Sequence, residues 1–430
     1  MSSQGLTFGD PTRRAPGKQG LRLDITRATL QGKGEASEYG TGMPEVIIIG
    51  AGVTGMSIAY HLAKLGCRDV LVLERDTVGS GSTDRCAGGI RQQFATEANV
   101  RLSMESVRFF ERFEEETGHP ADFRQNGYLL LATTPADLNS LRAAARMQRG
   151  LGVPVDLLTA TEVAGLVPGI NVEDVLGASY CPTDGYADPY SVVSGFASAA
   201  KKLGVRVRED VQVTGIETRA GTVRGVRTTE GSVFAPAVVN AAGPHAGIIA
   251  SMAGLDLPVR ALRRHIFVTE PVFRRRSRLG GLNRADLPLV ADLHNGFWFR
   301  REGLCLIFGM RNPDQPEGFS TEVDWGFLTD TLARVACHRL PSLSSIGITR
   351  ARAGLHSDTP DYLAILGEAP EPRGLYLACG FSGHGFMHSP AVGRLMANLI
   401  LEKGTTPPEL EPFHPERFQQ QIAPRESAFI

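Results

Sequence analysis

Cysteine is scarce in this sequence of 430 residues. The six cysteines, at positions 67, 86, 181, 305, 337 and 379, are scattered, with no CxxC pair and no histidine at metal-ligand spacing. This pattern disfavours a zinc site or a disulfide framework, so we predict no metal. Reduced thiols are typical of proteins in the cytoplasm, and we therefore expect a cytoplasmic protein.

Net charge and long apolar runs are scarce as well. The formal net charge is −1, which leaves no excess of basic residues for nucleic acid or an acidic membrane surface. No apolar run approaches the roughly 18 residues that cross a bilayer. We therefore expect no nucleic-acid partner and no membrane span. Hydrophobic residues make up 42% and charged residues 21%, as in ordinary soluble enzymes, and the length allows two domains.

Residues 1–43 differ in character from the rest of the chain. They hold mostly Gly, Ser, Arg, Lys and Thr with little apolar periodicity, so we expect a flexible leader. They lack the apolar run of a secretory signal. Four acids also argue against a transit peptide, namely Asp10, Asp24, Glu35 and Glu38.

The stretch from Pro44 to Glu74 carries the clearest pattern in the chain. An apolar run at 46–49 meets the turn Gly50-Ala51-Gly52-Val53-Thr54-Gly55, a helical pattern continues through Leu65, and a second apolar run follows at 70–73. This order predicts a strand, a tight turn, a helix and a second strand. Such a βαβ unit binds a dinucleotide.

Each glycine of this turn has an expected task. Gly50 allows the sharp turn, Gly52 lets the backbone approach a pyrophosphate, and Gly55 lets the helix pack closely on the sheet. Glu74 ends the second strand and is placed to accept hydrogen bonds from an adenosine ribose. An acid here disfavours a 2′-phosphate, although Arg75 beside it keeps that alternative open.

Glycine and serine dominate residues 75–94, directly after this unit. The segment is too polar for a core and supplies hydroxyls and free backbone N–H groups. We predict that it wraps around the cofactor a second time, with an ordinary surface loop as the alternative.

The rest of the chain alternates between two kinds of pattern. From residue 205 the apolar period becomes two, which predicts short antiparallel strands at 205–208, 211–217 and 223–227. The α/β pattern returns at 234–252 and again after 361. We therefore predict the α/β class, with a Rossmann-like nucleotide-binding domain interleaved with an α+β substrate domain on a mixed or antiparallel sheet. The expected segments are 44–125, 187–257 and 353–405 for the first domain, 126–186 and 258–352 for the second, and 406–430 as a C-terminal tail.

Four stretches together resemble a known family. They are Ile47 to Glu74, Gly81-Ser82-Thr83 with Gly88 to Phe94, Val239 to Pro244, and Gly380-Phe381-Ser382-Gly383-His384-Gly385-Phe386-Met387. They are similar to the FAD-dependent amine and amino-acid oxidoreductases of the D-amino acid oxidase superfamily. That group includes sarcosine oxidase, glycine oxidase, dimethylglycine dehydrogenase and the β subunit of L-proline dehydrogenase. The resemblance covers roughly residues 44–403.

The resemblance implies FAD as the cofactor, with residues 380–387 clamping the flavin ring. The expected cofactor-binding residues are Gly50, Gly52, Val53, Thr54, Gly55, Glu74, Arg75, Gly81, Ser82, Thr83, Gly88, Gly89, Ile90, Val211, Ala242, Gly243, Gly354, Gly380, Ser382, Gly383, His384, Gly385, Phe386 and Met387. Relatives that attach FAD covalently use a Cys before a Thr-Pro-Asp segment or a His after Gly-Ser-Thr. This chain has Gly354-Leu355-His356 at the first place and Asp84-Arg85 at the second, so we predict non-covalent FAD.

The resemblance also implies a reaction, in which the C–N bond of a small amine or amino acid is oxidised by hydride transfer to flavin N5. The resulting imine is hydrolysed by water. Arg91 is the first candidate to bind a substrate carboxylate, with a surface ion pair as the alternative, and Arg300 is the second. The aromatics just before Arg300, namely Phe297, Trp298 and Phe299, are expected to line a pocket or cover the flavin face, with simple core packing as the alternative. His265 is a candidate to accept a proton or orient the amine, and His384 to polarise the flavin, each with a structural role as the alternative.

The electron acceptor is either oxygen or an electron-transfer partner. Monomeric sarcosine oxidase has lysines where this chain has Cys305 and Met387, and this departure from the family pattern weakens the expectation of fast reaction with oxygen. Two other interpretations stay open at this point. One is an NAD-dependent dehydrogenase on the same βαβ unit, and the other is a flavin-bearing subunit or assembly factor within a hetero-oligomer.

Overall fold

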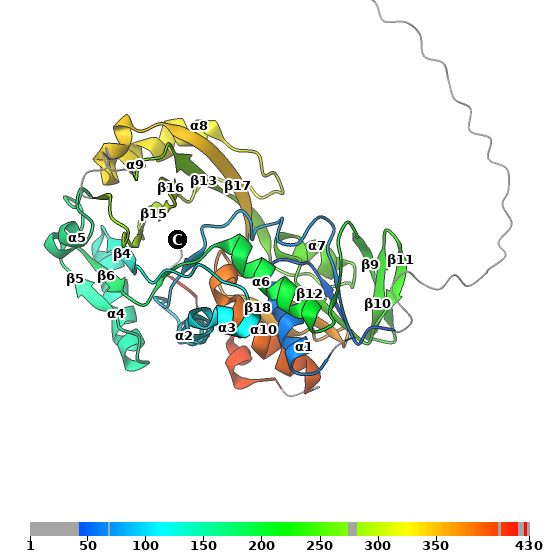
Figure 1. Cartoon of the computed structure of the whole chain (residues 1–430). Helices are drawn as coiled ribbons and strands as arrows, with labels where there is room; N and C mark the ends of the chain where they lie inside the picture. Colours follow the sequence, from blue (N-terminus) through cyan, green and yellow to red (C-terminus); the bar gives the residue numbers. More distant parts are fainter. Residues whose placement is uncertain (1–42, 68, 274–281, 403–405, 420–424, 428–430) are drawn as a thin grey trace, which may run out of the picture. The chain divides into compact units, whose positions relative to one another are not determined.

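The computed structural model describes residues 43–67, 69–273, 282–402, 406–419 and 425–427, and Figure 1 shows the course of the chain. The predicted leader, residues 1–43, lies outside the described residues except for Met43. Within the described part, the strands form a six-stranded and an eight-stranded sheet together with two smaller ones. None of the helices described there is long and apolar enough to cross a membrane.

The six-stranded sheet carries the predicted nucleotide turn. Its order is β18-β19-β12-β1-β2-β8, and its neighbouring strands run parallel except for β18 and β19. Parallel strands are covered on both faces, which explains why every residue of the two central apolar runs is buried. The bounds are β1 (Val46–Ile49), β2 (Val70–Leu73), β8 (Arg206–Arg208), β12 (Ala237–Asn240), β18 (Ile365–Glu368) and β19 (Leu375–Cys379).

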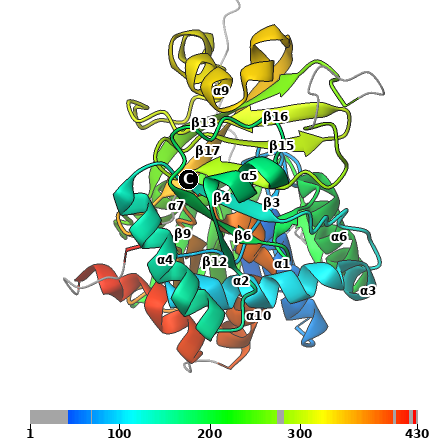
Figure 2. The ribbon, with the colours of Figure 1, turned by 90° about the vertical axis from the view of Figure 1, so that its left-hand side faces the viewer.

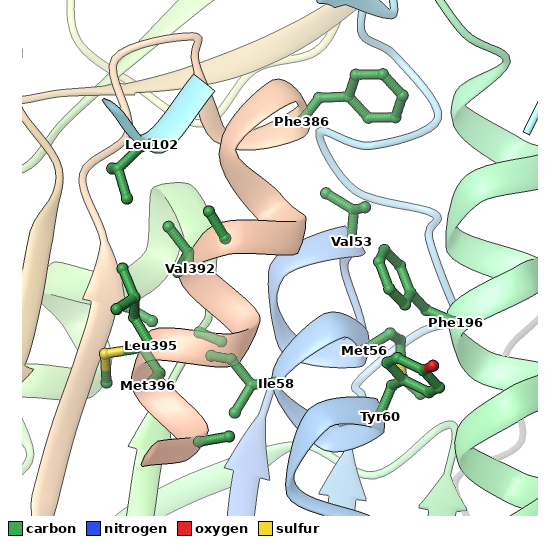
Figure 3. Close-up of a cluster of buried hydrophobic side chains, with 14 of the residues drawn as sticks. Val53, Met56, Ile58, Tyr60, Leu102, Phe196, Phe386, Val392, Leu395 and Met396 are labelled. Atoms are coloured by element: carbon green, nitrogen blue, oxygen red, sulfur yellow. The ribbon is translucent and has the colours of Figure 1, made fainter. Parts of the chain in front are cut away.

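Three helices form the main core of this domain. The central helix α1 (Val53–Lys64) packs between α10 (Gly385–Leu401) and α6 (Pro189–Lys202). Figure 3 shows Met56 and Tyr60 of α1 facing Phe196 of α6, while Ile58 lies on the side of α10. The first turns of α1 and α10, with Val53 and Phe386, lie at the same end of this core. Two helix N-termini therefore open toward one region.

The eight-stranded sheet has the order β17-β13-β16-β15-β14-β4-β6-β5, antiparallel except for the pair β14 and β4. Aromatic residues on one face of this sheet, including Phe267, Phe299 and Phe308, share a hydrophobic cluster with Phe327 of α8 and Ala336 of α9. Figure 2 shows β13, β15 and β16 between α9 and the first domain. The bounds are β4 (Tyr128–Ala132), β5 (Asp156–Leu158), β6 (Gly177–Cys181), β13 (Arg260–Thr269), β14 (Leu289–Asp292), β15 (Trp298–Glu302), β16 (Cys305–Gly309) and β17 (Ile348–Asp358).

Several helices begin at the caps that the sequence provides. Thr159 and Glu162 form a capping box at the start of α5, and the side chain of Asp188 caps α6 ahead of Pro189. The remaining elements are α2 (Glu97–Glu111), α3 (Phe113–Thr117), α4 (Pro135–Gly150), α5 (Ala160–Leu166), α7 (Ala246–Ser251), α8 (Trp325–Phe327), α9 (Ala333–Arg339), β3 (Gly89–Ile90), β7 (Gly185–Tyr186), β9 (Val213–Arg219), β10 (Thr222–Thr228), β11 (Gly231–Phe234), the 3-10 turns η1 (Gly243–His245), η4 (Pro341–Ser345), η5 (Pro408–Phe413) and η6 (Pro415–Gln419), and a π turn η3 (Leu328–Leu332).

One strand prediction was wrong. Residues 205–208 were expected to form an antiparallel strand, but β8 pairs in parallel with β2 and extends the six-stranded sheet. Its alternating arginines reflect a strand at the edge of that sheet, where one neighbour is missing. The antiparallel prediction is confirmed for the other two segments, which form β9 and β10.

The C-terminal segment packs against the first domain in its described part. Leu410 and Phe413 are fully buried in the main core. The guanidinium of Arg417 pairs with Asp361 at 2.7 Å, and both side chains are buried. Glu426 accepts hydrogen bonds at the start of α2, including one of 2.8 Å from the Thr96 hydroxyl. The described part of the predicted tail is therefore a structural part of the domain.

Candidate active site

A cavity of about 610 Å³ lies between the two large sheets. It is lined by the nucleotide turn, the segment 80–89, the turn after β12, the end of β17 and the start of α10. The eight-stranded sheet contributes Trp298 and residues of β13. Pockets for small molecules and cofactors commonly measure roughly 300–1,000 Å³. Distant segments thus converge on one site of suitable size.

The nucleotide turn has the geometry that its glycines require. Gly50 has a φ of +104°, and a Cβ there would lie 2.6 Å from the carbonyl oxygen of Ala241. At Gly55 a Cβ would lie 2.0 Å from the carbonyl oxygen of Gly50, so this glycine permits the close packing of helix on turn. A Cβ at Gly52 would approach nothing closer than Thr83 Oγ1 at 3.5 Å. The cavity side of Gly52 is therefore open to a ligand.

An acidic side chain marks the end of the cavity at β2. The carboxylate of Glu74 accepts hydrogen bonds from the backbone N–H of Ala51 at 2.8 Å and of Asp76 at 3.0 Å. Each carboxylate oxygen keeps a further acceptor site, which suits the hydroxyls of a ribose. The backbone N–H of Val211 donates to the carbonyl of Glu74 at 2.8 Å and so places Val211 along the same wall.

The segment after β2 wraps the cavity, and its hydroxyls attach it to α1 and to the eight-stranded sheet. Thr83 Oγ1 accepts a hydrogen bond of 3.0 Å from the backbone N–H of Val53 in the first turn of α1. Ser82 donates at 2.6 Å to the carbonyl of Leu355 in β17. Gly88, with a φ of +68°, leaves no room for a Cβ because the carbonyl oxygen of Ala187 would be 2.2 Å away. These contacts fix the wrap against the nucleotide turn.

The start of α10 forms the opposite end of the site. This helix of 17 residues has no acidic residue in its first turn and no side-chain cap. Its positive end and free N–H groups therefore face the cavity. Ser382 precedes it in the left-handed region, with a φ of 50°, and its hydroxyl accepts a hydrogen bond of 3.1 Å from the N–H of Thr359. A non-glycine residue in this region costs free energy and persists where its surroundings require it.

Most of the predicted cofactor residues line the cavity, and four do not. Gly55 and Gly380 act one layer behind the wall, since a Cβ at Gly380 would lie 2.6 Å from Thr359 Cγ2. Ile90 is a core residue, and Ser382 is fully buried within the clamp. All the other predicted cofactor residues listed above belong to the lining.

Arg91 is buried and lines the cavity beside the clamp. One guanidinium nitrogen lies 3.3 Å from His384 Nε2, and the group stacks over the Phe94 ring at 4.0 Å from its centroid. Burial and the charge of Arg91 hold the pKa of His384 far below its usual range. His384 is therefore neutral, and its Nε2 accepts from the guanidinium. The structure brings together these two predicted residues.

A buried polar network that the sequence did not reveal supports Arg91. Asp184 accepts hydrogen bonds from the backbone N–H of Gln92 at 2.9 Å and from the Gln93 amide at 3.1 Å. Ser179 donates to the Gln93 side-chain oxygen at 2.6 Å. Burial raises the pKa of Asp184 to about 6, although the hydrogen bonds from the glutamines oppose that shift. This network fixes the backbone that carries Arg91 to the eight-stranded sheet.

The second arginine candidate, Arg300, does not line the cavity. Its Nε donates to the carbonyl of Ala87 at 2.6 Å, and another nitrogen contacts Glu302 at 3.1 Å. The guanidinium also stacks over Tyr186 at 4.6 Å from the ring centroid. Since Ala87 does line the cavity, Arg300 supports the wrap from behind.

The ring of His265 is turned toward the helices that cover the eight-stranded sheet. Its Nε2 accepts a hydrogen bond of 3.1 Å from the backbone N–H of Asp324, and the ring packs near Phe267 and Phe327. The neighbouring Ile266 instead packs toward Ala87 on the opposite face. Burial lowers the pKa of His265 to about 4. Although His265 belongs to the cavity wall, its acceptor nitrogen is occupied, so the structure does not favour it as a base.

Other residues of the cavity wall were not singled out from the sequence, except for Trp298, which was expected to line a pocket. Trp298 and Tyr128 supply aromatic surface, and Arg264, Arg311 and His356 supply polar groups. The strand alternation gave one usable signal, because Trp298 lines the cavity while the flanking Phe297 and Phe299 lie in the core behind the sheet.

His388, one turn after His384, has a partner in the protein. Its Nε2 lies 2.9 Å from the hydroxyl of Ser103. Burial lowers the pKa of His388 to about 3. Among the described residues no cluster of three or more His, Cys, Asp or Glu side chains is arranged to hold a metal ion.

The order of groups along the cavity fits FAD. An acid stands at one end, an open backbone at Gly52 and the positive end of α1 follow, and an uncapped helix terminus stands at the other end. Taken in the same order along the cavity, these features match the ribose, the pyrophosphate and the flat, electron-accepting ring of that cofactor. The uncapped start of α10 is the feature that a nicotinamide cofactor would leave unexplained.

Comparisons with known proteins agree with this geometry. The family model for DAO, FAD dependent oxidoreductase, matches residues 45–399. The mitochondrial dimethylglycine dehydrogenase of Rattus norvegicus is 32% identical over 421 residues, covering 93% of this chain and 48% of that protein. The FAD-dependent oxidoreductase domain-containing protein 1 of Bos taurus is 33% identical over 420 residues, covering 87% of this chain and 84% of that protein.

A solved structure extends the likeness to three dimensions. L-proline dehydrogenase from P. horikoshii superposes with a TM-score of 0.80 and 33% identity, covering 88% of this chain and 98% of that one. The present chain spans about half the length of the dimethylglycine dehydrogenase that it matches. The comparisons confirm FAD as the cofactor, which sets aside the NAD alternative. The chain belongs to the DAO family of FAD-dependent oxidoreductases.

Proposed function

We propose that this protein oxidises the C–N bond of a small amine or amino acid of the sarcosine, dimethylglycine, glycine or proline type. The observation that carries the proposal is one continuous cavity that joins the nucleotide turn, the clamp at α10 and the buried Arg91. Bound FAD supplies the hydride acceptor. The imine product is then hydrolysed by water.

In this proposal Arg91 binds the carboxylate of the substrate. A guanidinium offers a planar fork of donors that matches a carboxylate, and burial strengthens such charge-assisted hydrogen bonds. Arg91 lines the cavity next to His384 at the start of α10. A carboxylate held there lies near the clamp, so the carbon to be oxidised is brought close to the flavin ring. The buried network at Asp184 keeps this arginine in place.

The protein residues orient the substrate and exclude water. The apolar wall formed by Trp298, Leu289 and Ile266 suits the methyl or ring carbons of the substrate. The support for amino-acid substrates from relatives is that proteins named as a dimethylglycine dehydrogenase and an L-proline dehydrogenase match nearly the whole chain.

We also propose that FAD is held without a covalent bond. Arg85 and Gly354 belong to the two segments, 84–85 and 354–356, where relatives with covalent FAD carry a His or a Cys, and these two residues lie against one another. A Cβ at Gly354 would be 2.8 Å from Arg85 Cβ. Acid precipitation tests this point, since all of the yellow colour is expected in the supernatant and none in the protein pellet.

An electron-transfer acceptor suits this site better than oxygen. Cys305 packs against the apolar cluster of Ile266, Val268 and Ile307, and Met387 lines the cavity. Neither residue supplies the positive charge that assists oxygen in monomeric sarcosine oxidase. We therefore propose a dehydrogenase, which reduces a dye faster than it consumes oxygen.

The experiment that tests the proposed function uses the purified, flavin-loaded protein without oxygen. A panel of sarcosine, dimethylglycine, glycine, L-proline and D-proline is added, and the loss of oxidised flavin absorbance is followed. Bleaching by at least one of them is expected. Oxidised flavin that persists with every member, while dithionite bleaches it, would favour a flavin-bearing subunit that acts only with a partner.

A further inference from the structure

A cluster of three polar side chains on β13 and β17 has no part in the function proposed above. Arg264 of β13 donates to Asp358 of β17 at 3.2 Å, and both side chains are largely buried. His356 lies two residues before Asp358 on the same strand. Figure 1 shows these two strands side by side, and their register places Leu262 opposite His356.

The second oxygen of this carboxylate faces the imidazole. Asp358 Oδ1 lies 3.8 Å from His356 Nδ1, which is beyond hydrogen-bond length. Both atoms are buried, and neither has a hydrogen-bond partner in the part of the chain that the structure describes. Each buried polar atom that lacks a partner costs free energy, so the two atoms are each other's natural partners after a small movement.

The other nitrogen of the ring opens to the cavity. His356 lines the cavity with its side chain 27% exposed, while its Nδ1 is buried. The exposed nitrogen is therefore Nε2. The ring lies directly against the clamp, because a Cβ at Gly383 would be 2.5 Å from His356 Cε1. His356 thus reaches the place where the flavin clamp meets the eight-stranded sheet.

The neighbours decide which nitrogen carries the proton. A carboxylate accepts hydrogen bonds, so Asp358 favours the tautomer with hydrogen on Nδ1. Nε2 then has a free lone pair and acts as an acceptor. Burial and the charge of Arg264 lower the pKa of His356 to about 3, so the ring is neutral at ordinary pH and keeps this acceptor.

We propose that His356 Nε2 accepts a hydrogen bond from an N–H group of the substrate nitrogen, and that this contact selects primary and secondary amino acids over tertiary ones. The inference rests on the proposed function and adds a substrate class to it. A primary or secondary amine keeps an N–H when its lone pair is free to assist departure of the hydride. A neutral tertiary amine such as dimethylglycine has none, so it leaves the acceptor unpaired in a closed site.

The test uses two ligands of one shape that are not oxidised, pyrrole-2-carboxylate and furan-2-carboxylate. Both have a five-membered ring and a carboxylate. They differ at one ring position, where the pyrrole has an N–H group and the furan has an oxygen atom. Binding to the flavin-loaded protein is read from the perturbation of the flavin spectrum. The wild type is expected to bind the pyrrole at least about 10-fold more tightly than the furan.

Variants of His356 and Asp358 isolate the contact. His356→Phe keeps a ring against Gly383. This variant is expected to lose the preference for the pyrrole ligand while its binding of the furan ligand is not weakened. His356→Gln keeps an acceptor and is expected to retain part of the preference. In Asp358→Asn the amide offers an N–H to Nδ1, moves the ring proton to Nε2 and removes the acceptor, so the preference falls as well. Flavin content per protein checks that each variant is folded.

Two results would overturn the inference. One is an undiminished preference for the pyrrole ligand in His356→Phe, and the other is an equal weakening of both ligands, which a purely structural role would produce. Failure of the proposed function has a different signature. In that case the wild type binds neither carboxylate, and no amine of the panel bleaches the flavin.

Discussion

Replacing Arg91 by glutamine is expected to weaken the binding of carboxylate substrates by about 2–5 kcal/mol, the usual loss when one partner of a buried, hydrogen-bonded charge pair is removed. Arg91 is 2% exposed, which places it in the buried class to which that range applies. At about 1.4 kcal/mol for each factor of ten, the loss is roughly 30-fold to 4,000-fold in the dissociation constant.

The substitution also removes the stacking of the guanidinium on the Phe94 ring, at 4.0 Å from its centroid. That contact contributes about 0.5–2 kcal/mol, but it stabilises the fold and does not distinguish one ligand from another. Comparing sarcosine with N-methylethylamine, in which a methyl group replaces the carboxylate, separates the two effects. In Arg91→Gln, only the affinity for sarcosine is expected to fall.

The affinity of each ligand is measured by anaerobic titration, with the flavin spectrum as the readout. Arg300→Gln is the matched control. Arg300 is also a buried arginine, but it lies outside the cavity lining and donates a hydrogen bond to the carbonyl of Ala87. We expect it to lower flavin retention while leaving the ratio between the two ligands unchanged. Arg91 does not bind the carboxylate if Arg91→Gln weakens the binding of both ligands alike, or if only Arg300→Gln loses the preference for the carboxylate ligand.

Four further changes test other parts of the structure. Gly55→Ala places a Cβ 2.0 Å from a backbone oxygen, so the protein is expected to be purified with little flavin; a normal flavin-to-protein absorbance ratio would contradict this packing. Glu74→Gln removes a charged acceptor and is expected to weaken FAD by about 1.5–3 kcal/mol in a fluorescence titration; unchanged affinity would place the ribose elsewhere. Phe413→Ala is expected to cost about 3–5 kcal/mol in urea unfolding, since the ring is fully buried, whereas a loose tail would show no change. His388 is buried with a pKa of about 3 against an ordinary 6.5, so its contribution to stability is present above pH 6.5 and is lost at about 1.4 kcal/mol per unit as the pH falls toward 3; His388→Gln is expected to flatten the dependence of unfolding on pH between 7 and 5, and an unaltered slope would assign that dependence to other groups.

The nucleotide turn could be predicted from the sequence because its requirements are local. The positive φ of Gly50 belongs to the turn itself, and Gly55 is needed because its helix packs on the carbonyl oxygen of Gly50, five residues earlier. The contact of Gly50 with the distant Ala241 adds to a requirement that the turn already imposes. The caps at Thr159 and Asp188 are local for the same reason.

The roles of residues on the second sheet depend on contacts between distant segments. Alternation along β13 separates His265 from Ile266, but the sequence does not tell which face of the sheet meets the cofactor. The position of His356 depends on the pairing of β17 with β13, nearly a hundred residues earlier in the chain. The hydrogen bond from Thr96 to Glu426 spans 330 residues. Such pairings leave no periodic pattern in the sequence.

The most direct test of the central claim is anaerobic reduction of the bound flavin by small amino acids. We predict that sarcosine or proline bleaches the oxidised flavin of the purified wild-type protein. The flavin retained by Arg91→Gln is expected to be bleached only at much higher concentrations of the same amino acids. An oxidised spectrum that persists with every amine tested, in a protein that dithionite still reduces, would contradict the central claim.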